Sequence, residues 1–420
     1  MSETSGEKSD ANIDADTPAE RPPTPAPLKI DYAPHWGLDS GVIHLNHGAF
    51  GACPRRVLHA QDAFRRQLEA NPVRFVGREL PGLMAHARAE LASFVGADAP
   101  NLVFVPNTTT GVNAVLGSLD LQPGDAILVN SQGYGPCTLA ARAIAAQKGA
   151  RLITAELPFN PTSADALHDA LINAVTPQTR IALFDHVTSP TALMLPAARI
   201  AKSLRDRGVL SLIDGAHAPG MIPLDLNTLG ADFYVGNCHK WLCSPRGAAF
   251  LHVAPEHQAT TRPPVFSHGA GLPDDDPQRF QSEFGWMGTY DVTSYLSVPA
   301  AIDFLRALVP GGWPALMAHN HRMALLGRDL VCDALGIDPP APDDLLGSMA
   351  ALPLPDRPGP PVDFPREVDP LQQALFEEAG IEIAVMTWPA HPHRLLRLSC
   401  QLYTTEDDLQ KLADALSTMI

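Results

Sequence analysis

The 420-residue sequence has little that would place it in a membrane or on nucleic acid. No stretch approaches the ~20 consecutive apolar residues that a helix needs to cross a bilayer. The polar, acidic start, MSETSGEKSD, lacks the apolar core of a signal peptide. Acidic residues outnumber basic ones by 46 to 30, and this balance argues against a nucleic-acid-binding face. The sequence therefore predicts a cytoplasmic protein with neither a membrane nor a nucleic acid as its partner.

Cysteine is also sparse, and the six cysteines stand at positions 53, 137, 238, 243, 332 and 400. Such scattered positions form no disulfide framework, so reduced thiols in a cytoplasmic protein are the default. Cys238 and Cys243 lie five residues apart, but no second close pair accompanies them. No zinc or other metal site is therefore predicted.

Composition divides the chain into regions. Residues 1–33 are rich in Asp, Glu, Pro, Ala and Ser, and too few of them are apolar to repay ordering, which predicts a disordered tail. Residues 61–308 are expected to form a large domain and residues 309–420 a smaller α+β domain. In the latter, residues 338–365 are rich in Pro and Asp and predict surface loops around the apolar segment SMAALPL.

Apolar runs alternate with helical patterns between residues 101 and 253. Strands are predicted at 101–105, 125–130, 150–157, 180–187, 209–214, 231–236 and 247–253. Helices are predicted at 108–119, 137–149, 163–175 and 197–208. Runs without polar alternation are typical of strands covered by helices on both faces, and strand–helix alternation indicates a mainly parallel sheet. The predicted fold class is therefore α/β. After residue 310, helices at 313–335, 370–380 and 405–419 surround short strands at 381–388 and 393–400.

The carboxyl ends of parallel strands are where ligands collect in open α/β sheets. Polar residues follow or end several of the predicted strands, and these are Asn107, Ser131, Asp185, Asp214 and Asn237. We therefore expect a binding site at this edge of the sheet.

Lys240 stands in GNCHKWLCSPRG, directly after the apolar run ADFYV. A desolvated ammonium is costly, so such a lysine needs a salt bridge, a surface position or a covalent role such as an imine with a carbonyl. Asp214 ends the run VLSLID one strand earlier; taken alone, it could simply cap the next turn. A carboxylate for a pyridinium nitrogen and a lysine for an aldehyde are two groups that a pyridoxal phosphate site requires.

The segment PNTTTGVN, residues 106–113, lies between a predicted strand and a predicted helix. Helix N-termini carry unpaired N–H groups and partial positive charge, so they bind phosphate. Alone, the threonines could be an ordinary helix cap. In the order phosphate cradle, aspartate, lysine, at the ends of three strands, the segment favours a pyridoxal phosphate site.

The stretch SLIDGAHAPGMIPLDLNTLGADFYVGNCHKWLCSPRGAAFL resembles the cofactor-lysine region of the class V aminotransferase family, pyridoxal phosphate enzymes of fold type I. IHLNHGAFGACPRRVLHA, NPVRFVGREL, FDHVTSPTALMLP and RLLRLSCQLYTTEDDL are most similar to the isopenicillin N epimerase branch. The resemblance covers residues 40–420. It implies a large cofactor-binding domain with a mainly parallel seven-stranded sheet, a smaller C-terminal domain, and a segment at residues 34–60 that packs on the small domain.

The resemblance also implies roles around the cofactor ring. Lys240 would bind the cofactor aldehyde covalently and move the substrate α-proton. Asp214 would keep the ring nitrogen protonated. His217 and Ser189 would lie near the phenolic oxygen, and Tyr134 would stack on the other face of the ring, where it is also a candidate second base.

Further roles concern the phosphate and the neighbouring subunit. The resemblance implies that Thr108 and Thr109 hold the phosphate together with Asn237 and His239. It implies that Thr289, in WMGTYD, reaches the phosphate of a neighbouring subunit, which predicts a homodimer.

For the substrate, the resemblance implies that Arg397 grips an α-carboxylate with its bidentate fork. Asn46 and His47 would line the substrate entrance. Each residue taken alone also has a structural interpretation: the histidines as core residues, Tyr134 as a packing residue, and Arg397 as part of a basic patch with Arg394.

The reaction is less specific than the cofactor. An epimerase or racemase acting on a small-molecule amino acid or amino-acid-containing substrate is the main prediction, with a carbon–sulfur lyase and an aminotransferase as alternatives. A cysteine desulfurase is disfavoured, because it needs a nucleophilic cysteine on the loop before Arg397. The segment EIAVMTWPAHPHR contains none, and Cys400 follows the arginine.

Overall fold

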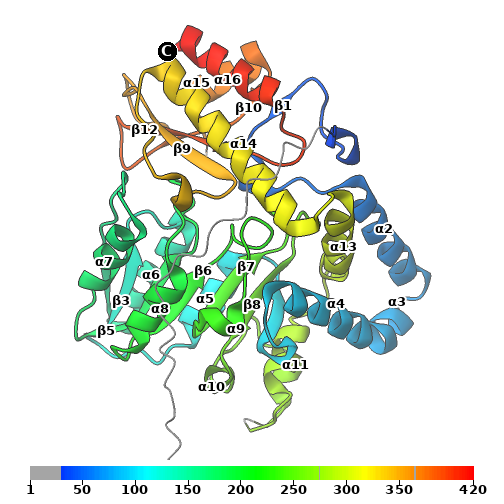
Figure 1. Ribbon diagram of the computed structural model, residues 1–420. Helices are drawn as coiled ribbons and strands as arrows, with labels where there is room; N and C mark the ends of the chain where they lie inside the picture. The colour runs from blue at the N-terminus through cyan, green and yellow to red at the C-terminus, as the bar shows by residue number, and fades with distance from the viewer. Residues whose placement is uncertain (1–29, 274, 364–365) are drawn as a thin grey trace, which may run out of the picture.

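The computed structural model describes residues 30–273, 275–363 and 366–420 (Figure 1). The predicted tail, residues 1–33, therefore lies almost wholly outside the described residues. Tyr32 is already buried, with 2% of its surface exposed. The boundaries given above for the tail and the domains stay predictions.

A seven-stranded sheet forms the centre of the large lower half of the molecule in Figure 1. Its strand order is β2-β8-β7-β6-β5-β3-β4. The bounds are β2 Leu102–Val105, β3 Ala126–Asn130, β4 Arg151–Ala155, β5 Thr179–Asp185, β6 Leu210–Asp214, β7 Phe233–Asn237 and β8 Ala249–Val253. Strand β8 runs antiparallel to β2 and β7, and the other pairs are parallel. The predicted α/β class with a mainly parallel seven-stranded sheet is confirmed.

Helices cover both faces of this sheet, which explains the continuous apolar runs. Along β3, Leu128 belongs to one core cluster, whereas Ile127 and Val129 belong to another. Because successive side chains of a strand point to opposite faces, the two clusters lie on opposite sides of the sheet. The crossover helices are α5 Thr108–Ser118, α6 Gly135–Lys148, α7 Ala164–Asn173 and α8 Ala197–Arg205.

The smaller upper half in Figure 1 is built on a three-stranded antiparallel sheet with the order β11-β12-β9. The strands are β9 Met349–Leu354, β11 Ala384–Thr387 and β12 Arg394–Ser399, and the helices are α14 Gly312–Leu335, α15 Pro370–Ala379 and α16 Glu406–Met419. The apolar segment that the sequence left among loops is β9, which pairs along its whole length with β12.

The N-terminal segment joins the two halves. Strand β1, Ile43–His44, pairs in parallel with β10, Ile381–Glu382. Leu45 belongs to the core cluster of the smaller half, whereas Trp36 belongs to that of the larger half. Helix α1, His47–Phe50, follows directly, so it lies where both halves meet.

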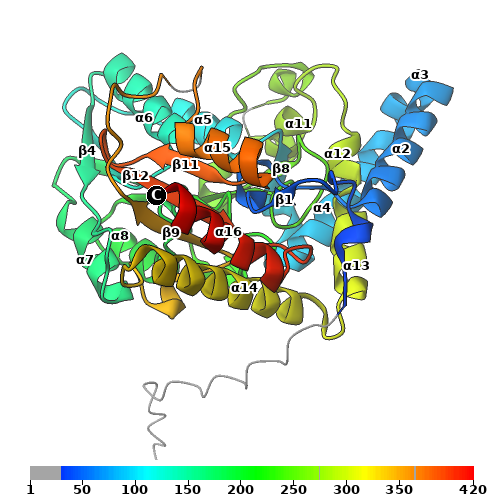
Figure 2. The same ribbon diagram turned by 90° about the horizontal axis from the view of Figure 1, so that it is seen from above.

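The chain then forms a helical group that was not predicted from the sequence: α2 Arg55–Ala70, α3 Pro72–Arg74, η2 Phe75–Glu79 and α4 Leu80–Val95. Seen from above, α2 and α3 project at the edge of the molecule, away from the smaller half (Figure 2). The remaining helical elements are η1 Ala33–His35, η3 Ala99–Asn101, α9 Leu226–Leu229, α10 Pro255–Gln258, η4 His268–Gly271, α11 Arg279–Gly285, α12 Thr293–Leu296, α13 Val298–Leu308 and η5 Asp343–Leu345. None of the helices in the described ranges has the length and apolar character needed to cross a membrane.

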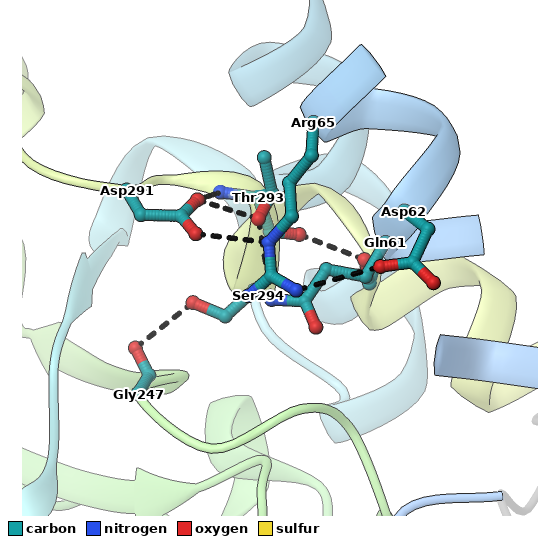
Figure 3. A network of polar contacts seen from close by, with 8 residues as sticks. Gln61, Asp62, Arg65, Gly247, Asp291, Thr293 and Ser294 are labelled. Carbon is teal, nitrogen blue, oxygen red and sulfur yellow. Dashed lines mark hydrogen bonds and ion pairs between the residues drawn. The ribbon is translucent and has the colours of Figure 1, made fainter. Parts of the chain in front are cut away.

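A polar network ties α12 to α2 and to the loop that enters β8 (Figure 3). Arg65 Nε donates to Asp291 Oδ2 at 3.2 Å. Ser294 Oγ donates to the carbonyl oxygen of Gly247 at 3.2 Å. The network thus fixes the segment that follows Thr289 against the loop between Lys240 and β8.

Candidate active site

The carboxyl ends of β5, β6 and β7 bring three predicted polar positions together. Asp185 and Asp214 end neighbouring strands and are direct register partners, and Asn237 ends the next strand. All three are buried, with exposures of 5%, 2% and 6%. A buried polar residue in such a place needs a partner.

Lys240 lies on the turn after β7. The backbone N–H groups of Cys238 and His239 donate to the carbonyl oxygen of Ala248, at 3.0 and 3.2 Å, and this fixes the turn. Lys240 Nζ lies 3.0 Å from His217 Nε2. Burial, followed by the charge of Arg397, lowers the pKa of Lys240 to about 8. The lysine is thus poised to lose its proton near neutral pH.

Asp214 is held from two sides. The backbone N–H of Ala216 donates to its Oδ1 at 3.0 Å, and the thiol of Cys137 donates to its Oδ2 at 3.3 Å. Burial raises the pKa of Asp214, an effect that these hydrogen bonds and the charge of Lys240 oppose. A cationic N–H placed against this carboxylate would relieve the cost of its burial.

The start of α5 forms the predicted phosphate cradle. Asn107 caps the helix by accepting from the N–H of Thr110 at 2.9 Å, and the N–H of Thr108 donates to Asn237 Oδ1 at 3.0 Å. The Thr108 hydroxyl is buried and has no hydrogen-bond partner among the described residues. Thr109 is partly buried on the next position. An unpaired hydroxyl at a helix N-terminus is well placed for an anionic oxygen.

Arg397 enters the site from β12, in the smaller half of the molecule. Its Nη1 donates to the carbonyl oxygen of Ser189 at 2.6 Å and approaches the Ser189 hydroxyl at 3.4 Å. Its Nε is buried without a partner among the residues described. Burial lowers the pKa of Arg397 to about 10. The guanidinium therefore keeps donor capacity for an anion such as a carboxylate.

Tyr134 stands at the N-cap of α6 and is 41% exposed. Its backbone N–H donates to Asp185 Oδ1 at 3.3 Å, which anchors the loop that carries it. Burial raises the pKa of the Tyr134 phenol, as do the nearby Cys137 and Asp214. The phenol thus keeps its proton at neutral pH.

His47 and Asn46 differ from the residues above. His47 is completely buried, its Nδ1 lies 2.9 Å from Tyr403 Oη, and its Nε2 lies 3.0 Å from the carbonyl oxygen of Lys240. The Nε2 atom therefore holds the lysine turn, and the Nδ1 atom ties His47 to Tyr403. A Cβ on Gly51, whose φ is +68°, would collide with the carbonyl oxygen of His239, so this segment packs directly on the turn.

Asn46 lines a pocket of about 590 Å³ formed largely by the N-terminal segment. His44, Arg246 and Glu382 also line it, whereas Lys240 does not. The predicted roles of Asn46 and His47 in substrate binding stay predictions.

His239 and Thr289 complete the predicted set. His239 Nδ1 lies 2.8 Å from the carbonyl oxygen of Ala248, and burial lowers the pKa of His239 to about 4. Thr289 is exposed on the segment between α11 and α12, directly after Gly288 at φ +114°. The structure therefore leaves Thr289 accessible from outside the chain.

Three further residues contact the predicted ones. Asp185 accepts from Asn130 and from the Tyr134 loop, Cys137 contacts Asp214, and Trp241 Nε1 donates to His217 Nδ1 at 3.2 Å. The position of Asp185 at a strand end was visible in the sequence. Cys137 lies inside a helical pattern with no signal of its own, and the side-chain direction of Trp241 depends on the turn geometry.

A separate cluster lies at the opposite end of β7. Ligand atoms of Asp232, Glu256 and His257 come within 4.8 Å of one another. Asp232 Oδ2 already accepts from the backbone and side chain of Ser211, and Oδ1 lies 3.1 Å from His257 Nε2. This cluster joins the strand ends to α10 and takes no part in the site around Lys240.

The side chains around Lys240 fit pyridoxal phosphate. The unpaired Thr108 hydroxyl at the start of α5 suits the phosphate, the buried Asp214 carboxylate suits a protonated ring nitrogen, and the amine of lowered pKa suits an aldehyde. The three groups come from the ends of separate strands in one parallel sheet, so they converge on one place.

Comparison with known proteins agrees with this geometry. The Aminotransferase class-V family model matches residues 43–331. The chain is 37% identical to isopenicillin N epimerase of Streptomyces clavuligerus over 91% of this chain and 96% of that protein. It is 30% identical to putative L-cysteine desulfhydrase 1 of Oryza sativa subsp. japonica, over 94% and 86% of the two chains.

Solved structures share the fold. The cysteine desulfurase of Thermococcus onnurineus NA1 superimposes with a TM-score of 0.77 at 17% identity, covering 94% of this chain and 99% of that one. The family model matches most of the chain, and the lysine, the aspartate and the helix N-terminus lie at one sheet edge. Both findings lead to the same conclusion. The chain belongs to the class V aminotransferase family of fold type I, and its cofactor is pyridoxal phosphate.

Proposed function

We propose that the protein is a pyridoxal-phosphate-dependent epimerase that acts at the α-carbon of an amino acid or of an amino-acid unit in a larger substrate. The observation that carries this proposal is the placement of a lysine of lowered pKa beside an arginine with an unpaired donor in one buried site. The relatives named isopenicillin N epimerase support the reaction type.

The residues have complementary tasks. Arg397 binds the substrate α-carboxylate through its guanidinium and so orients the α-carbon. Bound pyridoxal phosphate supplies an electron-withdrawing ring that stabilises charge at this carbon. Lys240 Nζ takes the α-proton from one face. Asp214 keeps the ring nitrogen protonated.

Inversion needs a proton from the opposite face. Tyr134 supplies it, because it lines the same pocket as Asp214 and its raised pKa keeps the proton on the oxygen. Lys240 and Tyr134 then form an acid–base pair in which one member takes a proton and the other gives one.

A carbon–sulfur lyase is the second candidate, because relatives named L-cysteine desulfhydrase match nearly the whole chain. Loss of a β-thiolate after removal of the same α-proton would use the same residues. Desulfurase chemistry is disfavoured, because Cys400, the cysteine nearest to Arg397 in sequence, is fully buried and follows it.

One experiment separates the two. The full chain loaded with pyridoxal phosphate is incubated in deuterated water with isopenicillin N and, separately, with L-cysteine and cysteine conjugates. Epimerisation gives deuterium at the α-carbon with inverted configuration, whereas the lyase gives pyruvate and ammonia. The Lys240→Ala variant is the control. Formation of pyruvate and ammonia without any inverted product would overturn the proposal.

We further infer that the enzyme is a homodimer in which Thr289 reaches the partner's phosphate site, and that it works in the cytoplasm. Thr289 is exposed, as are the apolar side chains of Phe50 and Phe266, at 75% and 68%. All six cysteines are free, as in reducing compartments.

Mixed dimers test this arrangement. A K240A chain and a Thr289→Val chain are each expected to have low activity. A hybrid of the two contains one site with Lys240 from one chain and Thr289 from the other, so activity returns only if Thr289 serves the partner's site. A monomer by analytical ultracentrifugation would refute the homodimer.

A further inference from the structure

Trp241 contacts His217, the side chain that lies beside the lysine amine. The indole Nε1 lies 3.2 Å from His217 Nδ1, and His217 Nε2 lies 3.0 Å from Lys240 Nζ. Trp241 and His217 are buried, at 0% and 2% exposure. The three groups therefore form a chain of hydrogen bonds in which Trp241 and His217 are shielded from water and Lys240 is partly buried.

The proton positions in this chain follow from the chemistry of the groups. An indole nitrogen can only donate, so His217 Nδ1 must accept and carries no proton. A neutral imidazole then carries its single proton on Nε2, which points at Lys240 Nζ. An ammonium cannot accept a hydrogen bond, whereas a neutral amine can.

We propose that Trp241 is a positioning residue that locks His217 as the Nε2–H tautomer and thereby favours the neutral, reactive form of the Lys240 amine over the charged one. If His217 instead carried its proton on Nδ1, its Nε2 would accept from a lysine ammonium and stabilise the charged form. The indole N–H excludes that arrangement, because two N–H groups would then face each other.

The surroundings of both side chains agree with this assignment. Burial, and then the charges of Lys240 and Arg397, lower the pKa of His217 far below its usual value, so the ring is neutral. Burial and Arg397 also lower the pKa of Lys240. Three groups on other elements raise the pKa of Lys240 and so oppose this effect. They are Asp214 on β6, Cys137 on α6 and Asp185 on β5. Because these groups favour the charged lysine, the tautomer of His217 helps to decide whether the Lys240 amine is charged or neutral.

The consequence for catalysis concerns the proton on the Lys240 amine. A neutral amine is the form that attacks an aldehyde and that can accept a substrate α-proton. Trp241 thus acts through His217 on the availability of the Lys240 lone pair. This consequence rests on the proposed role of Lys240, but the tautomer and the protonation state belong to the protein itself and can be measured without turnover.

The test uses the full chain freed of its cofactor. Lys240 is labelled with an amine-reactive reagent over a pH series, and the modified peptide is quantified by mass spectrometry. In the wild type the labelling midpoint is expected near pH 8. In Trp241→Phe, His217 can change tautomer, and the midpoint should rise by about one pH unit, the size of one hydrogen bond to a charged group.

Trp313→Phe is the matched control, because Trp313 is also buried and donates through its indole to the carbonyl oxygen of Ile302, with no contact to His217 or Lys240. Its labelling midpoint should equal that of the wild type. An unchanged midpoint in a folded Trp241→Phe protein would overturn the proposal.

A second measurement leaves Trp241 unchanged. Nitrogen NMR of the unloaded wild-type chain with ¹⁵N-labelled histidine distinguishes the two imidazole tautomers, and His217 is assigned by its loss in His217→Gln. The proposal predicts a proton on Nε2, and a proton on Nδ1 would refute it. Failure of either measurement leaves the proposed function intact, because that function is tested separately by deuterium incorporation and product analysis with isopenicillin N and L-cysteine.

Discussion

Asp185 and Asp214 lie opposite each other at the ends of neighbouring parallel strands, and both are buried. Their hydrogen bonds indicate that the two carboxylates have different tasks. Asp185 accepts from Asn130 and from the backbone of the Tyr134 loop. Asp214 accepts only from a backbone N–H and a weak thiol donor among its described contacts. The first carboxylate is therefore committed to the protein, and the second keeps capacity for the cofactor.

Asp214→Asn should remove the charge that keeps the ring nitrogen protonated, and activity should fall by roughly 10²-fold or more. The measurement is the rate of α-deuterium incorporation by the loaded enzyme. Asp185→Asn is the control: it perturbs the Tyr134 loop but leaves Asp214 in place, so it should cost far less. Equal losses in the two variants would contradict the separation of tasks.

Asp214→Asn is also expected to change how the stability of the fold depends on pH. Burial raises the pKa of Asp214 in the folded chain. A group of this kind holds its proton more tightly folded than unfolded, so its contribution is most favourable below the unfolded pKa, about 4, and is lost as pH rises through the folded pKa. In the unloaded chain, D214N should therefore unfold at a higher temperature than the wild type at pH 8, and the gap should close toward pH 4. Thermal unfolding across this range checks the sign, and a gap that widens at low pH would contradict it.

Thr108→Val probes the phosphate cradle. The Thr108 hydroxyl is buried without a partner in the described part of the chain, so an isosteric methyl should leave the unloaded chain as stable or slightly more stable. Affinity for pyridoxal phosphate should fall by about tenfold, the loss of one hydrogen bond to a charged group. Titration of the unloaded chain with pyridoxal phosphate measures the cofactor affinity, and thermal unfolding measures the stability.

Thr110→Val is the comparison for that experiment, because the Thr110 hydroxyl bonds Asn107 within the cap. Thr110→Val should lower the stability somewhat and leave the affinity for pyridoxal phosphate nearly unchanged. If both variants lost affinity equally, the cradle would be a general property of the helix end and not of Thr108.

The sequence predicted the central sheet closely, because its strands are apolar on both faces and its helices are regular. The strand ends also located Asp214, Lys240 and the start of α5. Strand β9 was not predicted, since Pro353 and the surrounding Pro-rich stretches mask a strand that forms only by pairing with β12. The structural role of His47 was equally hidden, because it depends on α1 packing against a turn almost 200 residues later.

Arg397→Lys should weaken substrate binding. A lysine keeps the positive charge but loses the planar fork, so KM should rise by about tenfold or more with a smaller effect on kcat. Arg394→Lys lies on the same strand and provides the control, because Arg394 is paired with Asp369 at 2.9 Å. Steady-state kinetics with the amino-acid substrate checks both. A loss confined to kcat would contradict a role in carboxylate binding.

Tyr134→Phe separates removal of the α-proton from its return. Lys240 remains, so the α-hydrogen should still exchange with deuterated water at a rate within about tenfold of the wild type. Without the phenol, the proton returns mainly from the lysine face, so formation of the inverted product should fall by roughly 10²-fold. Chiral chromatography of the product, combined with proton NMR of the α-position, measures both quantities in one sample. Because Tyr134 is 41% exposed and its backbone holds the contact to Asp185, the substitution should leave the fold intact. Inversion at the wild-type rate in this variant would show that another group delivers the second proton.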